Sequence, residues 1–375
     1  MNNMTEYLKW RGDIPMEAFP LCEADWLVMA QLAYIPFDDV VKDTYTPEFS
    51  VGQAADAVLE RLSSKDGNRI INFSENSEFL HEIINSPRFS ALSVCAYRNI
   101  FSVEEQEQFC AVTFLLPDGT PFIAFRGTDS TLVGWKEDFN MAFSDAVPAQ
   151  LDAVKYIEQT SRAFPDKKLL VCGHSKGGNL AVYGSAFCEK EVQDKISAVR
   201  NLDGPGFSEK VISREGFVRI LDRTETVIPA SSIVGILLEH AESFTVIRSY
   251  ASATPFQHDP FTWEISRCGY VPVENISDVS KYIDATLKHW VDAMPEELRE
   301  SFINGLYNII SSAGIDDVRE IFSPRSVIAI LKSLKNADSA TGAVLSEAMG
   351  LFQKAAGTGF PAFAEKLKNS VIKTK

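Results

Sequence analysis

The segment that most constrains the fold of this chain is LLVCGHSKGGNLAVYGSAF, at residues 169–187, where a short apolar run meets a helix at a glycine turn. The turn, GHSKG at 173–177, is a Gly-x-Ser-x-Gly pattern. A serine at so sharp a turn is held in a strained conformation that lifts its Oγ out of the sheet, and the flanking glycines avoid clashes. The helix that follows directs free N–H groups and the positive end of its dipole toward developing negative charge. The segment predicts an α/β fold with Ser175 as a nucleophile.

A fortuitous glycine turn is the alternative, because about one chain in ten of this composition would contain the bare pattern. The strand–turn–helix context favours the functional interpretation, as do Gly178 and the small Ala181 where the helix meets the sheet. His174 lies inside the turn and is too near Ser175 in sequence to reach its Oγ. We therefore expect a structural role for His174.

Strand-like and helical patterns alternate on both sides of this segment. Runs rich in β-branched and aromatic residues lie between residues 91 and 127, and Pro117-Asp118-Gly119 predicts a turn between the last two. Helices are expected near 23–35, 53–64, 76–87, 148–163 and 176–189, and further buried strands at 169–172, 198–204, 217–221 and 244–250. The alternation predicts a mostly parallel sheet with helices on both faces, and an antiparallel hairpin at one end.

Beyond about residue 276 the pattern is helical throughout, with apolar residues at every third or fourth position. We therefore expect two units. The first is an α/β domain over residues 1–275, and the second is a helical C-terminal subdomain over residues 276–375.

Composition limits the partners and the cellular compartment. The chain has 36 Lys or Arg and 51 Asp or Glu, a formal net charge of −15, which disfavours nucleic acid and anionic membranes as partners. No apolar run approaches the ~20 residues that span a bilayer, so no stable membrane insertion is expected. The N-terminal residues lack the pattern of a secretory signal. The six cysteines are scattered without a C-x-x-C pair, which suits a reducing compartment, so a cytoplasmic protein is expected.

The sequence contains no H-E-x-x-H motif, no Walker loop and no dinucleotide G-x-G-x-x-G motif. It therefore supports neither a metal nor a cofactor, and none is expected.

A second informative segment, AFRGTD at residues 124–129, ends the predicted hairpin. An α/β hydrolase takes one oxyanion donor from the backbone N–H of the residue after the nucleophile, here Lys176, and another from a loop after an earlier strand. Thr128 suits that second position. The alternative is an ordinary hairpin exit with Arg126 in a surface salt bridge.

Together these segments carry a resemblance. AFRGTDSTLVGWKEDF followed by VCGHSKGGNLA resembles the class 3 (fungal-type) lipases, in which a strand ending in F-R-G-[ST] precedes a G-H-S-x-G-G elbow. More closely, the chain resembles a bacterial family of lipase-3-like hydrolases of unknown function. Four segments that recur in that family are present here, as GHSKGG, DGPGF (203–207), SIVG (232–235) and QHDPFTW (257–263). The resemblance covers roughly residues 20–270 and implies an α/β-hydrolase fold with a hydrolytic triad.

A nucleophilic serine needs a general base, and in α/β hydrolases the chain order is Ser, then Asp or Glu, then His. Only three histidines follow Ser175. His240 is expected at the end of an amphipathic helix, and His289 lies in the helical C-terminal region. His258 belongs to a polar loop just after a predicted strand and lies within the resemblance, so it is the predicted base. The alternative is a loop histidine without a role.

The predicted acid is Asp203, at the end of the strand that follows the nucleophile segment. A carboxylate at the carboxyl end of a parallel strand faces the same rim of the sheet as Ser175. Pancreatic-type lipases place their acid similarly, whereas the class 3 lipases place it one strand later, which here implies Glu225 or Asp222. A turn-forming Asp203 before Gly204, and a site with no acid at all, are the remaining alternatives.

The function expected from these residues is a serine carboxylic-ester hydrolase, lipase- or esterase-like, that cleaves an acyl ester through a Ser-His-Asp triad and an acyl-enzyme intermediate. The expected partner is a small-molecule acyl ester or lipid. A thioesterase or other acyl-transfer hydrolase is the nearest alternative, and a non-catalytic binding protein of the same fold is another. The sequence leaves the oligomeric state open.

Overall fold

An eight-stranded sheet carries the fold of the computed structural model, which describes residues 2–64, 73–129, 131–141, 144–252, 256–315, 317, 320–321 and 323–373. The strands lie side by side in chain order, as β1 (Phe49–Ser50), β2 (Ser93–Ser102), β3 (Glu107–Leu115), β4 (Pro121–Phe125), β5 (Leu169–His174), β6 (Ile196–Leu202), β7 (Thr224–Pro229) and β8 (Ser243–Ile247). β1 to β4 pair antiparallel, and β4 to β8 pair parallel. A separate short hairpin joins β9 (Ile265–Ser266) and β10 (Gly269–Tyr270).

The sheet is buried on both faces, as its continuous apolar strands predict. Along β4, Phe122 and Ala124 belong to one hydrophobic core, whereas Ile123 and Phe125 belong to the other. This alternation follows from the two-residue period of a strand. The β3–β4 hairpin lies within the antiparallel half and not at the edge of the sheet, because β1 and β2 extend the sheet beyond it.

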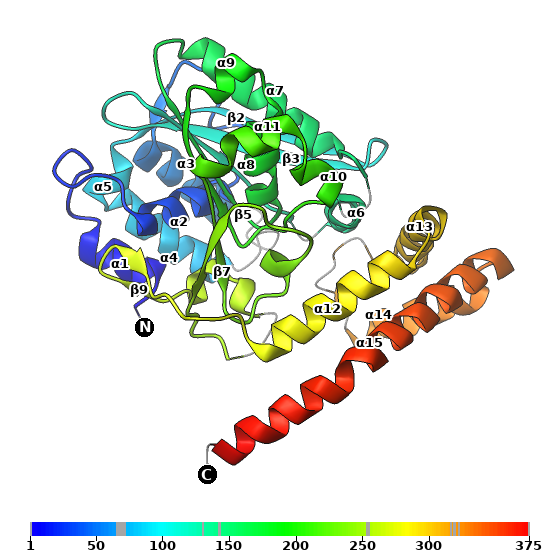
Figure 1. Cartoon of the computed structure of the whole chain (residues 1–375). Helices are drawn as coiled ribbons and strands as arrows, with labels where there is room; N and C mark the ends of the chain where they lie inside the picture. The colour runs from blue at the N-terminus through cyan, green and yellow to red at the C-terminus, as the bar shows by residue number, and fades with distance from the viewer. Residues whose placement is uncertain are drawn as a thin grey trace.

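Helices cover both faces (Figure 1). The core on one face includes residues of α1 (Met4–Arg11), α2 (Glu23–Leu32), α3 (Val51–Ser64) and α4 (Phe73–Ile84), and α5 (Pro87–Ser90) follows. The core on the other includes residues of α7 (Pro148–Ala163), α8 (Lys176–Phe187), α9 (Lys190–Gln193), α10 (Glu209–Ile212) and α11 (Glu215–Ile220). α6 (Leu132–Met141) lies between β4 and α7 in the chain. This is the α/β-hydrolase fold that the sequence predicts.

The strand predicted at residues 217–221 is wrong. Most of this run lies in α11, where Phe217 and Ile220 are fully buried and Val218 is exposed. The buried pair has the three-residue spacing of a helix face, and a short apolar run cannot distinguish a strand from a buried helix. The strand of this region is β7, which begins at Thr224.

His240 is also placed differently from the expected helix end. The 3₁₀ helix Val234–Ile236 ends before it, Leu238 has a positive φ of 64°, and Glu239 pairs with Phe207 in an isolated β-bridge. The side chain of His240 is buried beside Glu242, with 2.8 Å between Nδ1 and Oε1.

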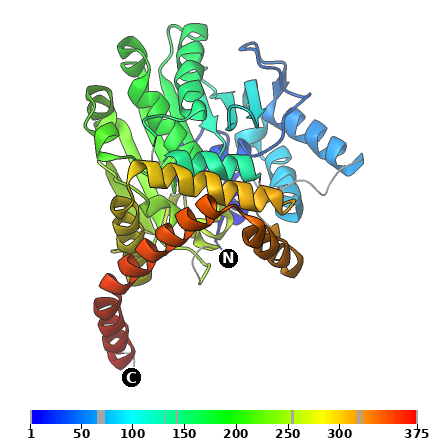
Figure 2. The same cartoon turned by 90° about the vertical axis from the view of Figure 1, so that its right-hand side faces the viewer.

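The C-terminal region is helical, as expected, and consists of α12 (Asp278–Ala293), α13 (Glu296–Ser312), α14 (Pro324–Asn336) and α15 (Ser339–Lys373). Figure 2 shows these helices along one side of the α/β core. Leu132 of α6 packs in a small apolar cluster with Ile310 of α13 and with Ile315. Among the residues described, no helix combines the length and apolarity needed to cross a membrane.

Candidate active site

The turn between β5 and α8 holds Ser175 in a strained conformation. Its φ of 59° and ψ of −135° lie in a region that residues with a side chain rarely adopt. Its amide donates to the Leu202 carbonyl of the neighbouring strand at 2.9 Å, which fixes the turn against the sheet. A Cβ at Gly173 would lie 2.1 Å from the Gly177 carbonyl oxygen, so only glycine fits there. The local sequence therefore produces the sharp turn it predicts.

Three side chains from separate segments form a continuous hydrogen-bonded row at this turn. His258 Nε2 lies 2.9 Å from Ser175 Oγ, and His258 Nδ1 lies 2.6 Å from Asp203 Oδ2. An ionised carboxylate only accepts hydrogen bonds, so Nδ1 carries the proton and Nε2 is free to accept from the serine hydroxyl. The structure thus brings together the predicted nucleophile, base and acid.

Asp203 is fully buried at the carboxyl end of β6, and its own φ is 53°. Burial raises the pKa of this carboxyl, while the hydrogen bonds from His258 and Ser232 oppose the rise. Ser232 Oγ donates to the same oxygen that faces His258, at 2.7 Å. Ser232 lies in the SIVG segment of the resemblance, but nothing in the sequence indicated its contact.

The alternative acids do not reach His258. Glu225 lies at the start of β7, where it pairs with Arg200 of β6 at 3.0 Å. Asp222 precedes β7, is largely exposed and pairs with Arg223 at 3.4 Å. In a parallel sheet the starts of the strands lie at the rim opposite their carboxyl ends. Both carboxylates therefore occupy the rim opposite Ser175, which corrects that alternative.

His174 supports the loop that carries His258. Its Nε2 lies 2.9 Å from the His258 carbonyl oxygen, which can only accept, so Nε2 must donate. Nδ1 is then an acceptor, 3.0 Å from the hydroxyl of Tyr34. Burial, followed by repulsion from the protonated form of His258, holds the pKa of His174 well below its ordinary value. His174 is thus a neutral structural residue, as expected, and Tyr34 is a partner that sequence reasoning missed.

The QHDPFTW segment is folded onto itself by hydrogen bonds. Trp263 is fully buried and donates through Nε1 to the Gln257 carbonyl at 2.9 Å. The Gln257 side chain accepts from the Ser231 amide at 2.7 Å and donates to the Ala251 carbonyl at 2.7 Å. These contacts fix the backbone on which His258 stands.

The predicted oxyanion loop, residues 126–129, lies directly against the serine turn. A Cβ at Gly127 would lie 2.9 Å from Ser175 Cβ and 2.7 Å from the His174 carbonyl oxygen. The next residue is Thr128, and Lys176 is the first residue of α8, where backbone N–H groups have no carbonyl partner within the helix. The structure therefore places the loop that carries Thr128 beside the turn that carries Lys176.

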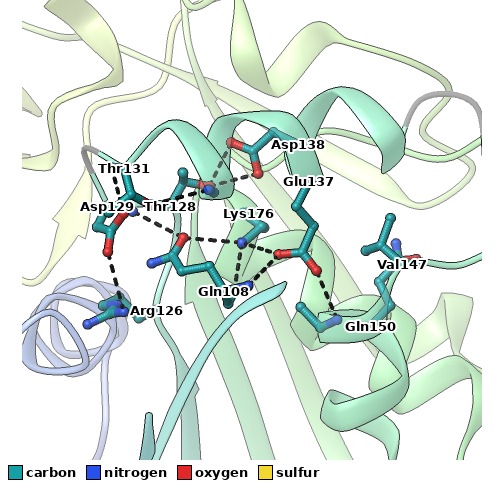
Figure 3. A network of polar contacts seen from close by, with 12 residues as sticks. Gln108, Arg126, Thr128, Asp129, Thr131, Glu137, Asp138, Val147, Gln150 and Lys176 are labelled. Carbon is teal, nitrogen blue, oxygen red and sulfur yellow. Dashed lines mark hydrogen bonds and ion pairs between the residues drawn. The ribbon is translucent and has the colours of Figure 1, made fainter. Parts of the chain in front are cut away.

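A buried ion pair connects this loop to the serine turn (Figure 3). Lys176 Nζ donates to Glu137 Oε2 at 2.8 Å and to the Gln108 carbonyl at 2.7 Å, and neither charged side chain is exposed beyond 1%. Glu137 also accepts from the backbone amides of Gln108 and Ala149, each at 3.0 Å. The side chain of Gln108 accepts from the Asp129 amide at 3.3 Å. One network thus joins α6, α8, β3 and the oxyanion loop, and sequence reasoning missed it.

Loss of the ammonium group of Lys176 is expected to be strongly destabilising. Lys176→Met would leave the Glu137 carboxylate buried without its counter-charge, which should lower the free energy of unfolding by about 3–5 kcal/mol. Urea denaturation measures this change. Lys190→Met is the matched control, because Lys190 forms an exposed pair with Asp194 and should cost less than about 1 kcal/mol. Equal losses in the two variants would contradict a structural role for the buried pair.

Asp138 holds the side chain of the oxyanion-loop threonine. Thr128 Oγ1 donates to the two carboxylate oxygens of Asp138, at 2.7 and 2.6 Å. Burial is the largest influence on this carboxyl and raises its pKa from 3.8 to about 6, against the opposing effect of the Lys176 charge. Asp138 therefore gains a proton more readily in the folded protein than in the unfolded chain.

This raised pKa has a defined consequence for stability. Between about pH 4 and about pH 6 the folded state binds more protons than the unfolded state, so Asp138 makes wild-type stability fall as the pH rises through that window. Asp138→Asn removes this titration. The free energy of unfolding of the variant minus that of wild type should therefore rise between about pH 4 and about pH 6 and level off above about pH 6. Urea denaturation at each pH measures the difference. Asp145→Asn, at an exposed surface pair, is the control and should follow wild type.

Comparison with known proteins identifies a family and distant structural relatives. The sequence profile of the Mbeg1-like family matches residues 83–308. No curated protein matches the chain. A mutant form of MDLA from Penicillium cyclopium is similar at 12% identity with a TM-score of 0.36, over 66% of this chain and 83% of that one. A structure described as "a serine protease triad forms the catalytic centre of a triacylglycerol lipase" is similar at 13% identity with a TM-score of 0.35, over 64% and 89%.

At this low similarity, the two structures say nothing about the activity of this chain. The family profile, in contrast, spans β2 to β8, the serine turn, Asp203 and His258, and extends into α13. Because the match covers more than half of the 375 residues, the chain belongs to the Mbeg1-like family.

Proposed function

We propose that this protein is a serine hydrolase of the lipase or esterase type, which cleaves a carboxylic ester through an acyl-enzyme intermediate. The observation that carries the proposal is the row of contacts from Ser175 Oγ through His258 to Asp203, at 2.9 and 2.6 Å. Each group has the orientation and hydrogen-bonding state that nucleophilic attack by serine requires.

In the proposed reaction Ser175 Oγ attacks the ester carbonyl while His258 Nε2 takes the hydroxyl proton. The carbonyl oxygen becomes an oxyanion, which the backbone N–H groups of Thr128 and Lys176 stabilise. The tetrahedral intermediate then expels the alcohol, and His258 returns its proton to that leaving oxygen. Water, activated by His258, attacks the acyl-serine in the same way and releases the acid and the free serine.

The surroundings of the row support these roles. Asp203 is excluded from solvent and receives a second hydrogen bond from Ser232, so its carboxylate is held toward His258 Nδ1. The side chain of His258 is 25% exposed, so the imidazole can meet a substrate from solution. A base must combine a fixed orientation with access to the reacting atoms, and His258 has both.

The proposal that the substrate is an acyl ester or lipid rests on the class 3 lipase resemblance of the FRGTD and GHSKGG segments. The contacts at Ser175 favour acyl transfer without distinguishing an oxygen from a sulfur leaving group. Parallel assays with short p-nitrophenyl esters and the corresponding acyl thioesters distinguish the two. A higher kcat/KM for the oxygen ester supports the esterase proposal, and a higher value for the thioester would replace it.

A fluorophosphonate probe tests the nucleophile directly. Wild-type protein should be labelled on Ser175, and Ser175→Ala should not be labelled. Absence of labelling in folded wild-type protein would contradict the proposed chemistry and would favour a binding protein of the same fold.

A further inference from the structure

The outward face of α14 is apolar. Val327, Ile328, Leu331 and Leu334 are 41%, 69%, 59% and 43% exposed to solvent. Their spacing places them along one face of the helix over two turns. A neighbouring face holds the helix to the protein through buried Ser326 and through Ile330, which packs in the cluster of Leu132 and Ile310. Single exposed apolar residues are ordinary, but four on one face indicate a surface for an additional partner.

Basic side chains accompany this apolar face. Arg325, Lys332 and Lys335 lie on the same helix and are exposed. Residues 324–375 contain eight Lys or Arg and three Asp or Glu, a net charge of +5, in a chain whose total is −15. The net positive charge is therefore concentrated in residues 324–375, while the rest of the chain carries a net charge of −20. A helix with an apolar face and flanking cations is typical of proteins that lie on anionic lipid surfaces.

α15 continues the same composition away from the core. Figures 1 and 2 both show its C-terminal half projecting beyond the other helices. The sequence of residues 354–375 has five lysines and one glutamate among Phe, Leu, Val and Ile residues. At physiological salt, charges attract an anionic surface mainly within about 10 Å of it, so the cations beside the bilayer count for more than the net charge of the chain.

We propose that α14, assisted by the basic C-terminal segment, docks this protein on the surface of an anionic lipid bilayer. The apolar side chains enter the headgroup boundary and the lysines contact the lipid phosphates, without any helix crossing the membrane. The net charge of −15 for the whole chain disfavours binding to an anionic membrane. Residues 324–375 carry a net charge of +5, so we expect this part of the surface to attract an anionic membrane. Docking does not depend on the chemistry at Ser175.

Vesicle flotation with the full chain tests the proposal. Wild-type protein should float with phosphatidylcholine vesicles that contain phosphatidylglycerol and remain at the bottom with phosphatidylcholine alone. Ile328→Asp/Leu331→Asp should weaken binding by at least about ten-fold, because it places two carboxylates in the apolar contact. Lys332→Glu/Lys335→Glu should weaken binding comparably and reduce its salt dependence, while the lysines of residues 354–375 retain part of it. Val103→Asp is the matched control, since Val103 is 60% exposed outside this region, and it should bind like wild type.

Three results would overturn the proposal. These are equal binding to neutral and anionic vesicles, unchanged binding in both double variants, and light scattering that shows a dimer which Ile328→Asp/Leu331→Asp converts to monomer. The last result would assign the face to a second copy of the chain. Urea denaturation serves as the folding control, and each variant should unfold at the same urea concentration as wild type. If wild-type protein binds the vesicles but does not react with the fluorophosphonate probe, the hydrolase proposal is refuted and the docking proposal stands.

Discussion

Replacing Ser175 by alanine is expected to lower kcat for ester hydrolysis by about 10⁵- to 10⁶-fold, since the serine is the proposed site of the covalent intermediate. The remaining rate should come from substrate binding and the two oxyanion N–H groups. Steady-state hydrolysis of a short p-nitrophenyl ester by purified wild type and variant measures this ratio. Ser175→Ala keeps the backbone and the neighbouring hydrogen bonds of the turn, so folding should be preserved.

Ser213→Ala is the matched control for this substitution. Ser213 is exposed, and its hydroxyl donates to the Lys210 carbonyl at 3.1 Å, so this variant should retain wild-type turnover. Turnover in Ser175→Ala within ten-fold of wild type, with both proteins folded, would exclude Ser175 as the nucleophile.

The second large effect is expected at the proposed acid. Asp203→Asn is nearly isosteric but replaces the acceptor at His258 Nδ1 with an amide, which cannot stabilise the imidazolium and can select the wrong tautomer. It should lower kcat by up to ~10⁴-fold. The same ester assay measures the loss, and denaturation curves verify that the variant is folded.

Glu225→Gln and Asp222→Asn are the controls for Asp203, because their carboxylates pair with Arg200 and Arg223 at the other rim of the sheet. Both should have small effects on kcat. The double variant Asp203→Asn/Ser175→Ala should be little worse than Ser175→Ala alone, because the members of a triad act as a unit. Collapse of activity in Glu225→Gln with near-normal turnover in Asp203→Asn would reject Asp203 as the acid.

Much of the site could be predicted from sequence because its chemistry is encoded locally. The pattern that predicts the strained turn at Ser175, a serine between glycines with a strand before it and a helix after it, lies within residues 169–187. The parallel sheet follows from the alternation of apolar strands with helical patterns. The same local reasoning was wrong at residues 217–221. This run of five residues is too short to reveal whether its apolar residues repeat every two positions, as in a strand, or every three to four positions, as in a helix.

The partners of these local elements depend on tertiary structure. Asp203 and Glu225 lie on neighbouring strands, and only the direction and register of those strands put one at the rim of Ser175 and the other at the opposite rim. The contact of Ser232 with Asp203 spans 29 positions, and that of Tyr34 with His174 spans 140. No pattern within a helix or a strand specifies such pairs.

The same distinction between local sequence and tertiary structure applies to the buried pair of Lys176 and Glu137 and to the exposed apolar face of α14. The sequence by itself determined which residues were charged or apolar and, for most segments, which formed helices and strands. Burial of one lysine against its glutamate, and exposure of four apolar residues on α14, were decided by packing. Backbone preference acts over a few neighbouring residues, whereas burial and pairing depend on which distant surfaces the folded chain brings into contact.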